Sequence, residues 1–377
     1  MSDDRRLCVL MDQIVNARAG TEGQVLKLVE GLSSRGWEVD FAVLRSSDLV
    51  RSRTLPVAAT DLGIGSIADP RSWWRLRSFG DRLRARGIRL VQAVFNDASV
   101  LAPPLLRATG HRVVISRRDM GFWYTPAYRT VLPITGRFVD AAVCNSQAVA
   151  DVTQRIERIP DDRIHVIYNG YAERTAPVAS THAHTPPVYG IIANLRPIKR
   201  IEDAIRALPR VRARVPGTEL HVVGAGDPSS YRALAESLGV SAHVVFFGGR
   251  TDAEDLIANF DVGVLCSESE GFSNAIIEYL RAGKPVVCTR TGGNPEIVQD
   301  AVNGHLVEVG DVDALSDRIA GLLCEPDRRA RLGAEGRRLV QERYGLSGML
   351  DRYEDLYRSL LEPGARRESL LRTTDRG

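Results

Sequence analysis

The segment CSESEGFSNAIIEYLRAGKPVV in the second half of the chain carries two carboxylates, Glu270 and Glu278, eight residues apart. Glu270 follows an apolar run of strand composition and precedes a glycine, whereas Glu278 lies in a run of helical composition. Either Ser273 or Asn274 is suited to cap the start of that helix. We therefore expect Glu270 in a loop at the carboxyl end of a strand, and Glu278 just over one turn inside the next helix.

An anion-binding site is expected between these two carboxylates. The first N–H groups of a helix have no partner within the helix, and they attract negative charge. One carboxylate is then placed to bind sugar hydroxyls, and the other to bind the hydroxyls of a ribose. The spacing fits a nucleoside-diphosphate sugar, and the alternative is a surface loop carboxylate followed by a solvated helix carboxylate.

Two cations precede this segment. Arg196 and Lys199 stand in ANLRPIKRIEDAIRAL, between a strand-like run and an amphipathic helical run. Cations at the carboxyl end of a strand suit a pyrophosphate leaving group, or they belong to an ordinary basic loop. Further on, Gly224 and Gly226 predict a tight turn with close backbone approach. Ser229 stands where the third glycine of a dinucleotide-binding fingerprint would fall, which disfavours a nicotinamide-dependent dehydrogenase.

Short apolar runs of strand composition alternate with amphipathic runs of helical composition along the chain. We expect strands at 7–11, 38–44, 90–95, 112–116, 141–145 and 164–169 in the first half, and at 188–194, 219–224, 243–248, 261–266, 284–289 and 305–309 in the second. Such alternation is typical of parallel sheets covered on both faces, and two series indicate two domains. The predicted fold class is α/β, with two doubly wound Rossmann-like domains and a ligand-binding cleft between them. We expect an N-terminal domain at 1–172, a linker at 173–187, a nucleotide-sugar-binding domain at 188–345, a C-terminal helix returning to the first domain at 346–362, and a disordered tail at 363–377.

The composition of the 377 residues is that of a globular protein, with 44% hydrophobic and 26% charged residues. No apolar run reaches the roughly 18 residues that a membrane span needs, and the first residues do not predict a signal peptide. The five cysteines are scattered without metal-ligand spacing. We expect a cytoplasmic, reducing location, no cofactor, no metal and no nucleic-acid partner.

A basic segment in the first half is a candidate for membrane contact. Residues 71–89, RSWWRLRSFGDRLRARGIR, hold seven arginines and one acid, together with Trp73, Trp74 and Phe79. A helix that starts near Ser72 would place arginines at anionic headgroups and tryptophans at the interface, which is one interpretation: peripheral contact with the cytoplasmic membrane face. The other interpretation is a crossover helix whose aromatic side chains pack on the sheet and whose arginines are solvated.

The spaced motifs resemble those of the retaining glycosyltransferases of family 4, which have the GT-B fold. The resemblance rests on the Glu-x7-Glu pair, with YLRAGKPVV and TGGNPEIV after it and ANLRPIKRIEDAI before it, in the family's order over 188–300. In the first half, AGTEGQVLKLVEGLSSRGWEV (19–39) and CNSQAVADV with IPDDRIHVIYNGY (144–171) also resemble the family. The resemblance covers nearly the whole chain, more weakly at 45–110.

The resemblance implies a donor site in the C-terminal domain. Arg196 and Lys199 match the residues that neutralise the donor's diphosphate. Glu270 matches the catalytic residue that holds the donor sugar, and Glu278 matches the residue that holds the ribose. The other expected donor-binding residues are Gly224, Gly226, Phe272, Ser273 and Asn274, the last three through backbone groups that face sugar and phosphate.

The N-terminal domain departs from the family's pattern at two places. Gly20 and Thr21 are expected in the loop that borders the phosphate and the acceptor, where many relatives carry paired glycines and this chain has Ala19 before Gly20. Many relatives also have a histidine after the fourth or fifth strand of this domain. Arg118 and Asp119 occupy that place here, and we expect one of them to take over contact with the sugar or the acceptor as a catalytic residue.

The expected activity is that of a metal-independent hexosyltransferase, because no Asp-x-Asp metal motif stands at a strand end; Asp311 in the Asp-x-Asp at 311–313 instead predicts a helix cap. The family's retention of configuration is usually explained by front-face attack, with the leaving phosphate helping to deprotonate the acceptor. We expect a UDP-sugar as donor, with a GDP-sugar as second choice, and a glycan or a lipid-linked acceptor.

Two other functions fit the same residues. A nucleotide-sugar epimerase would isomerise its substrate without an acceptor, and a non-catalytic protein would bind the nucleotide sugar without turning it over. On the acceptor side, Phe122, Trp123 and Tyr124 either stack on a sugar or lipid or pack within their own loop.

Overall fold

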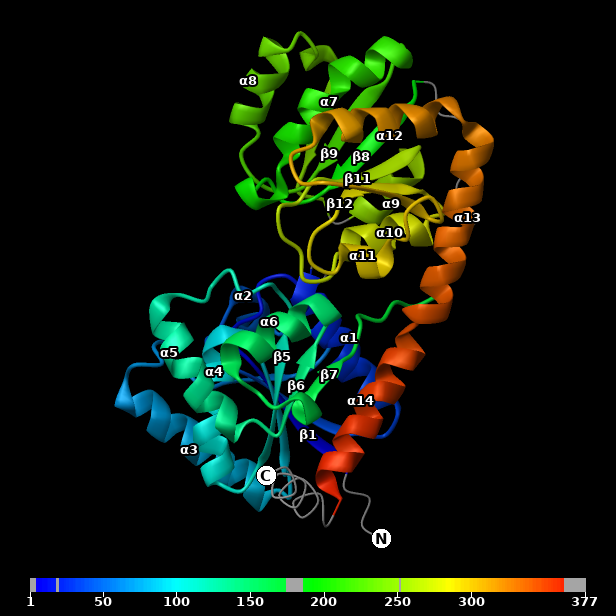
Figure 1. Cartoon of the computed structure of the whole chain (residues 1–377). Coiled ribbons are helices and arrows are strands. Elements are labelled where there is room, and N and C mark those ends of the chain that lie inside the picture. Colours follow the sequence, from blue (N-terminus) through cyan, green and yellow to red (C-terminus); the bar gives the residue numbers. More distant parts are fainter. Residues whose placement is uncertain (1–4, 18–19, 174–185, 251, 363–377) are drawn as a thin grey trace, which may run out of the picture. The chain divides into compact units, whose positions relative to one another are not determined.

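The computed structural model describes residues 5–17, 20–173, 186–250 and 252–362. The chain divides into two compact units: unit 1 comprises Met1–Gly170 and Leu346–Gly377, and unit 2 comprises Tyr171–Gly345. Each unit is a parallel sheet with helices on both faces, which confirms the predicted α/β fold class (Figure 1). Most of the expected linker and the whole expected tail lie outside the described residues, and the cleft stays a prediction.

Seven parallel strands form the sheet of unit 1, in the order β3-β2-β1-β4-β5-β6-β7. They are β1 (Arg6–Met11), β2 (Glu38–Val43), β3 (Ala59–Asp61), β4 (Leu90–Val94), β5 (Arg112–Arg117), β6 (Ala141–Cys144) and β7 (Ile164–Val166). In the centre, Val9 of β1 is paired with Phe41 on one side and with Gln92 on the other. Only β3 was not expected, since it has three residues and no apolar run.

The alternation of side chains along β1 explains the two layers of helices. Leu7, Val9 and Met11 point into one core with α1 (Gly20–Ser34) and α14 (Leu346–Leu361). Cys8 and Leu10 point into the other core with α3 (Pro70–Ala85) and α4 (Asn96–Ala108). The remaining helices of unit 1 are α2 (Asp48–Arg51), α5 (Pro126–Thr135), α6 (Gln147–Glu157), η1 (Gly136–Phe138) and η2 (Asp161–Arg163).

Helix α14 follows unit 2 in the sequence and packs on unit 1 beside α1 (Figure 1). Its Glu354 accepts a hydrogen bond from the indole of Trp37 at 2.8 Å and pairs with Arg35 at 2.9 Å. Its Tyr357 hydroxyl, fully buried, donates to the side-chain oxygen of Gln92. Buried polar bonds of this kind fix the register of the helix, because any shift would leave buried groups without partners.

Helix α3 corrects one detail expected for the basic segment. It begins at Pro70 with Asp69 as its cap, two residues before Ser72, which agrees with the expected start. Phe79 is only 6% exposed and belongs to the core, so it does not contribute to an outer aromatic surface. Trp73 and Trp74 remain 48% and 70% exposed. The helix is therefore a crossover helix by packing, with an outer face that is basic and carries two tryptophans.

Six parallel strands form the sheet of unit 2, in the order β10-β9-β8-β11-β12-β13. They are β8 (Val188–Ile192), β9 (Glu219–Val223), β10 (Val244–Gly248), β11 (Val262–Leu265), β12 (Val286–Thr289) and β13 (Gly304–Val307). All six lie within segments predicted as strands or extend one by a single residue. The order reverses between β8 and β11, which makes their carboxyl ends the expected ligand edge of the sheet.

Helices cover both faces of this second sheet (Figure 1). Helices α7 (Ile201–Arg214) and α12 (Val312–Cys324) share one core with the strands, and Asp311 caps α12 as predicted. On the other face Tyr279 of α10 (Asn274–Arg281) packs against Gly263, and α10 contacts α13 (Pro326–Arg343). The shorter helices are α8 (Ser229–Ser237), α9 (Ala253–Leu256), α11 (Asn294–Ile297), η3 (Pro197–Lys199), η4 (Ser241–His243) and η5 (Ile257–Asn259). Among the helices of the described segments, none combines the length and apolar character that crossing a bilayer requires.

The anchoring of α14 gives a first prediction. Glu354→Ala leaves the buried indole N–H of Trp37 without an acceptor, and we expect it to lower the unfolding free energy of unit 1 by about 1–3 kcal/mol. All four tryptophans lie in unit 1, so urea unfolding followed by tryptophan fluorescence reports on this unit. Asp355→Ala removes the same charge from an exposed position of the same helix and should change stability by less than about 0.5 kcal/mol. Equal stability of the two variants would contradict this role of Glu354.

Candidate functional site

The structure brings Lys199 and Glu270 together at the carboxyl edge of the unit 2 sheet. Lys199 ends the short helix η3 in the loop after β8, and Glu270 lies in the loop after β11. The ammonium of Lys199 donates to Oε1 of Glu270 at 2.6 Å. Their side chains are 25% and 11% exposed, so both charges are partly removed from water. Each charge balances the other, which offsets the cost of this desolvation. Two residues predicted for different parts of a ligand are thus direct partners of each other.

Arg196 and Glu278 lie on either side of this pair in the sequence. Arg196 is exposed, and none of the side-chain hydrogen bonds or ion pairs within the described residues includes it. Glu278 is half-buried in the second turn of α10. The next residue, Tyr279, is fully buried and accepts a hydrogen bond from the Ile192 N–H at 2.6 Å, which fastens α10 to the end of β8.

The start of α10 resolves the choice between two caps. Ser273 is the cap, since its hydroxyl accepts from the Ile276 N–H, and Asn274 is the first helical residue. The side chain of Asn274 instead accepts a hydrogen bond from the hydroxyl of Tyr171 at 2.5 Å. Phe272 is 6% exposed and packs edge-on against Tyr344. With the side chains of Phe272 and Asn274 in these contacts, backbone groups are what this segment can offer a ligand.

The loop that carries Glu270 is held by the loop after β12. The N–H of Gly293 donates to the carbonyl of Glu270 at 3.2 Å, and the hydroxyl of Thr291 donates to the carbonyl of Glu268 at 2.9 Å. Gly292 has a φ of +49°, and a Cβ there would lie 1.7 Å from the Glu270 carbonyl oxygen. Only glycine permits this approach, so TGGNPEIV fixes the position of Glu270.

The glycines after β9 support the loop of Arg196 in the same way. A Cβ on Gly224 would lie 1.9 Å from the carbonyl oxygen of Ala193, and Gly226 has a φ of +134° beside Leu195. The N–H of Leu195 donates to the carbonyl of Ala225 at 2.8 Å. The predicted close backbone approach is present, and the segment approached is the one that leads into Arg196.

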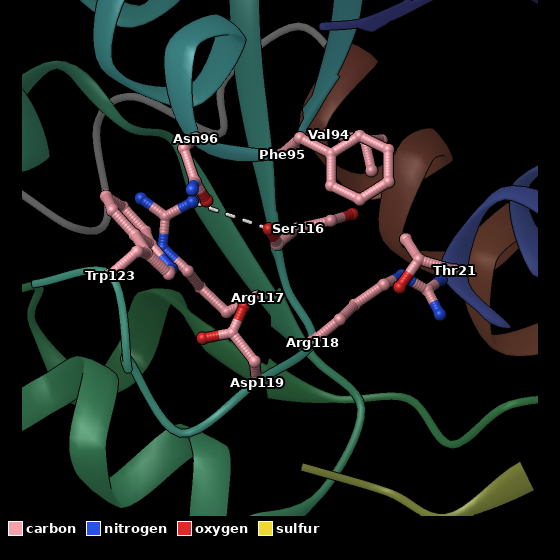
Figure 2. A pocket seen from close by; sticks show the side chains of 9 residues that line it. All are labelled: Thr21, Val94, Phe95, Asn96, Ser116, Arg117, Arg118, Asp119 and Trp123. Atoms are coloured by element: carbon pink, nitrogen blue, oxygen red, sulfur yellow. Dashed lines mark hydrogen bonds between the residues drawn. The ribbon is translucent and has the colours of Figure 1, made fainter. Parts of the chain in front are cut away.

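Unit 1 has a small cavity at the carboxyl ends of β4 and β5 (Figure 2). It is much smaller than a site for a whole small molecule, so it can receive one small group of a ligand. Its lining consists of Thr21, Val94, Phe95, Asn96, Ser116, Arg117, Arg118, Asp119 and Trp123. Three of the residues predicted for the N-terminal domain, Thr21, Arg118 and Asp119, therefore meet here. Gly20, with a φ of +54°, begins α1 next to Thr21.

Arg117 is a buried residue of the cavity lining. Its guanidinium makes two hydrogen bonds to the Glu157 carboxylate, at 2.5 and 2.8 Å, and Tyr124 donates to the same carboxylate. Burial acts to lower the pKa of Arg117, but the adjacent Glu157 carboxylate outweighs it and raises this pKa above its usual value. The sequence left open whether Phe122, Trp123 and Tyr124 stack on a ligand or pack within their loop. Tyr124 is buried and Phe122 is 76% exposed, whereas Trp123 lines the cavity with its ring against the guanidinium of Arg117.

Arg118 and Asp119 point to different sides of the cavity (Figure 2). The guanidinium of Arg118 extends towards Thr21 and donates to Oδ1 of Asn169 at 2.6 Å. Asp119 accepts from the Gly121 N–H at 2.7 Å. Burial raises the pKa of Asp119 above its usual value, although the hydrogen bond from the Gly121 N–H and the nearby charge of Arg117 oppose the shift.

Sequence reasoning missed several polar residues of this site. Asn96 and Ser116 line the cavity, and the buried Asn169 orients Arg118 from the end of the segment after β7. Asn96 and Ser116 lie at the carboxyl ends of predicted strands, which is a signal that could have identified them. Within the described segments, no group of three or more His, Cys, Asp or Glu side chains is arranged to hold a metal ion.

Comparison with known proteins assigns the chain to a family. The model described as Glycosyltransferase Family 4 matches residues 18–173, and the one described as Glycosyl transferases group 1 matches residues 173–339. A GDP-mannose-dependent alpha-(1-6)-phosphatidylinositol monomannoside mannosyltransferase of Mycolicibacterium smegmatis is 30% identical over 267 residues, which are 63% of this chain and 68% of that protein. The chain belongs to glycosyltransferase family 4.

This family 4 chain is also 27% identical over 231 residues to the N-acetyl-alpha-D-glucosaminyl L-malate synthase of Bacillus anthracis, which is 59% of the chain and 60% of that relative. The matches thus span about half to two-thirds of the curated relatives. Among solved structures, Anabaena Alr3699/HepE in complex with UDP has a TM-score of 0.77 at 20% identity, covering 94% of this chain and 100% of that one. A glycosyltransferase of Rickettsia africae has a TM-score of 0.81 at 17% identity, covering 95% and 99%. The fold is GT-B.

The glycine clamp on Glu270 gives a second prediction. Gly292→Ala forces a strained φ and a clash with the Glu270 carbonyl, so we expect the loops 266–273 and 289–293 to separate and their amide hydrogen exchange to accelerate at least tenfold. Gly321→Ala is the control, because it lies inside α12 with open space around it and should stabilise that helix slightly. Unchanged exchange in Gly292→Ala, measured by mass spectrometry, would show that Gly292 does not hold this loop.

Proposed function

We propose that the chain is a retaining, metal-independent glycosyltransferase that transfers a hexose-type sugar from a nucleoside-diphosphate sugar to a glycan or lipid-linked acceptor. The observation that carries the proposal is the Lys199–Glu270 pair at the carboxyl edge of unit 2, with exposed Arg196 in the same loop. A cation paired with a carboxylate can exchange that partner for a phosphate, while the carboxylate turns to sugar hydroxyls. Membership of family 4 supports the reaction class.

The residues divide the donor between them. Arg196 and Lys199 would balance the charge of the diphosphate, together with backbone N–H groups at the start of α10. Glu270 would hold the hydroxyls of the donor sugar, and Glu278 those of the ribose. The acceptor oxygen then bonds to the anomeric carbon as the bond from this carbon to the diphosphate breaks, and the acceptor proton passes to the leaving diphosphate. The new bond forms on the face that the diphosphate leaves.

Names of similar proteins support the choice of nucleotide. The solved structures of Anabaena Alr3699/HepE include complexes with UDP and with UDP-glucose. The mannosyltransferase of Mycolicibacterium smegmatis is named as GDP-mannose-dependent. We therefore propose a UDP-sugar as donor, with a GDP-sugar as second choice. On the acceptor side, we propose that the cavity of unit 1 binds the group that receives the sugar, with Arg118, Asp119 and the ring of Trp123 as its contacts.

Binding and turnover measurements with a set of nucleotide sugars test this proposal against its two alternatives. We predict that Arg196→Ala and Lys199→Ala each weaken binding of UDP or GDP by about 1.5–3 kcal/mol, because each removes a charge-assisted hydrogen bond to the diphosphate. Calorimetry measures this, and Arg214→Ala, at an exposed arginine near the end of α7, is the control. Unchanged nucleotide affinity in the double variant would contradict the donor site.

Turnover assays separate the alternative functions. Isomerised nucleotide sugar without acceptor would favour an epimerase, and binding without turnover would favour a non-catalytic protein.

We further propose that the outer face of α3 contacts an anionic membrane surface. The exposed arginines of this face are Arg71, Arg75, Arg77, Arg82 and Arg84, and Trp74 protrudes at the same end as Trp73. Arginine is attracted to anionic headgroups, and tryptophan is stable at the interface. The buried face of α3 does not need to move for such contact.

This gives a further prediction. The chain should co-sediment with vesicles that contain anionic phospholipid at low salt and much less with purely zwitterionic vesicles. Neutralising Arg75, Arg77, Arg82 and Arg84 should abolish binding, and Trp74→Ala should weaken it without changing its dependence on salt. Absence of binding to anionic vesicles at low salt would leave the face of α3 as an ordinary solvated surface and would favour a soluble acceptor.

A further inference from the structure

Two arginines line the cavity of unit 1, and Arg118 is the one that forms no ion pair among the described residues. Of its two arginines, Arg117 is neutralised by Glu157, and both side chains are almost completely buried, at 4% and 1% exposure. This pair contributes no net charge to the cavity. The charge of the site therefore depends on Arg118 and Asp119.

Asp119 carries the opposite charge, but it does not pair with Arg118. Its carboxylate accepts from the Gly121 N–H and turns towards Arg117, while Arg118 extends the other way (Figure 2). Among the ion pairs of the described residues, none includes Arg118. The acceptor of its one side-chain hydrogen bond, Oδ1 of Asn169, is a neutral amide oxygen.

Arg118 is nevertheless held in one orientation. Asn169 is only 3% exposed and anchors one terminal nitrogen of the guanidinium. The side chain of Asn145, also buried, donates to the backbone carbonyl of Arg118 at 3.2 Å. The Nε atom of Arg118 is buried and has no hydrogen-bond partner within the described structure. An oriented guanidinium with unused donors is suited to carboxylate or phosphate, which bind it through two parallel hydrogen bonds.

We infer that the cavity of unit 1 binds an anionic group, a phosphate or a carboxylate, on Arg118. This deepens the proposed function and rests on it for one assignment, namely that the anionic group belongs to the acceptor. Arg196 and Lys199 of unit 2 are the proposed partners of the donor's phosphates. Arg118, in contrast, is part of the lining of the unit 1 cavity. The acceptor is then a glycan or lipid-linked molecule that carries an acidic group close to the hydroxyl that receives the sugar.

Inorganic phosphate is the probe that tests the site itself. The indole N–H signal of Trp123, assigned with Trp123→Phe, should shift saturably in the full chain on titration with phosphate at constant ionic strength. Arg118→Gln should raise the dissociation constant at least tenfold, and Arg118→Lys should raise it less. Arg137→Gln, at an exposed arginine of unit 1, should leave it unchanged. An equal dissociation constant in the wild type and Arg118→Gln would overturn the inference.

A second measurement separates the two sources of the anion. If the anionic group belongs to the acceptor, Arg118→Gln binds UDP and GDP as tightly as the wild type in calorimetry. A tenfold loss of nucleotide affinity in this variant would overturn the assignment to the acceptor and give the anion to the donor. Failure of the proposed function looks different, because phosphate binding at Arg118 would persist while no nucleotide sugar is turned over.

Discussion

The ion pair of Lys199 and Glu270 is the interaction on which the candidate donor site depends. A lysine and a glutamate that are both largely removed from water are costly unless each has a charged partner, and the 2.6 Å contact supplies one. The pair is also exchangeable, since a phosphate can replace the carboxylate and a sugar hydroxyl can replace the ammonium. A ligand that offers both groups at once pays little desolvation cost, because the two charges are already partly desolvated.

The glycine-containing loops serve this pair. Gly292 lets the loop after β12 lie against the backbone of Glu270, and Gly224 lets the loop after β9 lie against Ala193, close to Arg196. Each glycine acts on the backbone of the neighbouring loop, and this action requires no contact with a ligand. In unit 1, Arg117 and Glu157 form a buried pair in which the two charges balance. Arg118 is then the arginine of the cavity lining that forms no ion pair within the described residues. Both units thus place oriented charges at the carboxyl ends of parallel strands.

Much of this organisation is predictable from the sequence, because buried parallel strands are continuous apolar runs and the helix start at Ser273 follows ordinary capping rules. The edge strand β3 was missed, since three residues with an exposed Thr60 and Asp61 carry no apolar signal. The inward position of Phe79 depends on which face of α3 meets the sheet. The pairing of Lys199 with Glu270 and of Arg118 with Asn169 joins segments 71 and 51 residues apart, and no local pattern specifies it.

A crystal structure of the full chain with bound uridine diphosphate would test the central claim most directly. The account predicts diphosphate oxygens within hydrogen-bonding distance of the Lys199 ammonium and the Arg196 guanidinium, with the ribose at Glu278 and with Glu270 released from Lys199. A diphosphate bound elsewhere, with the Lys199–Glu270 contact intact and Arg196 still facing solvent, would contradict it.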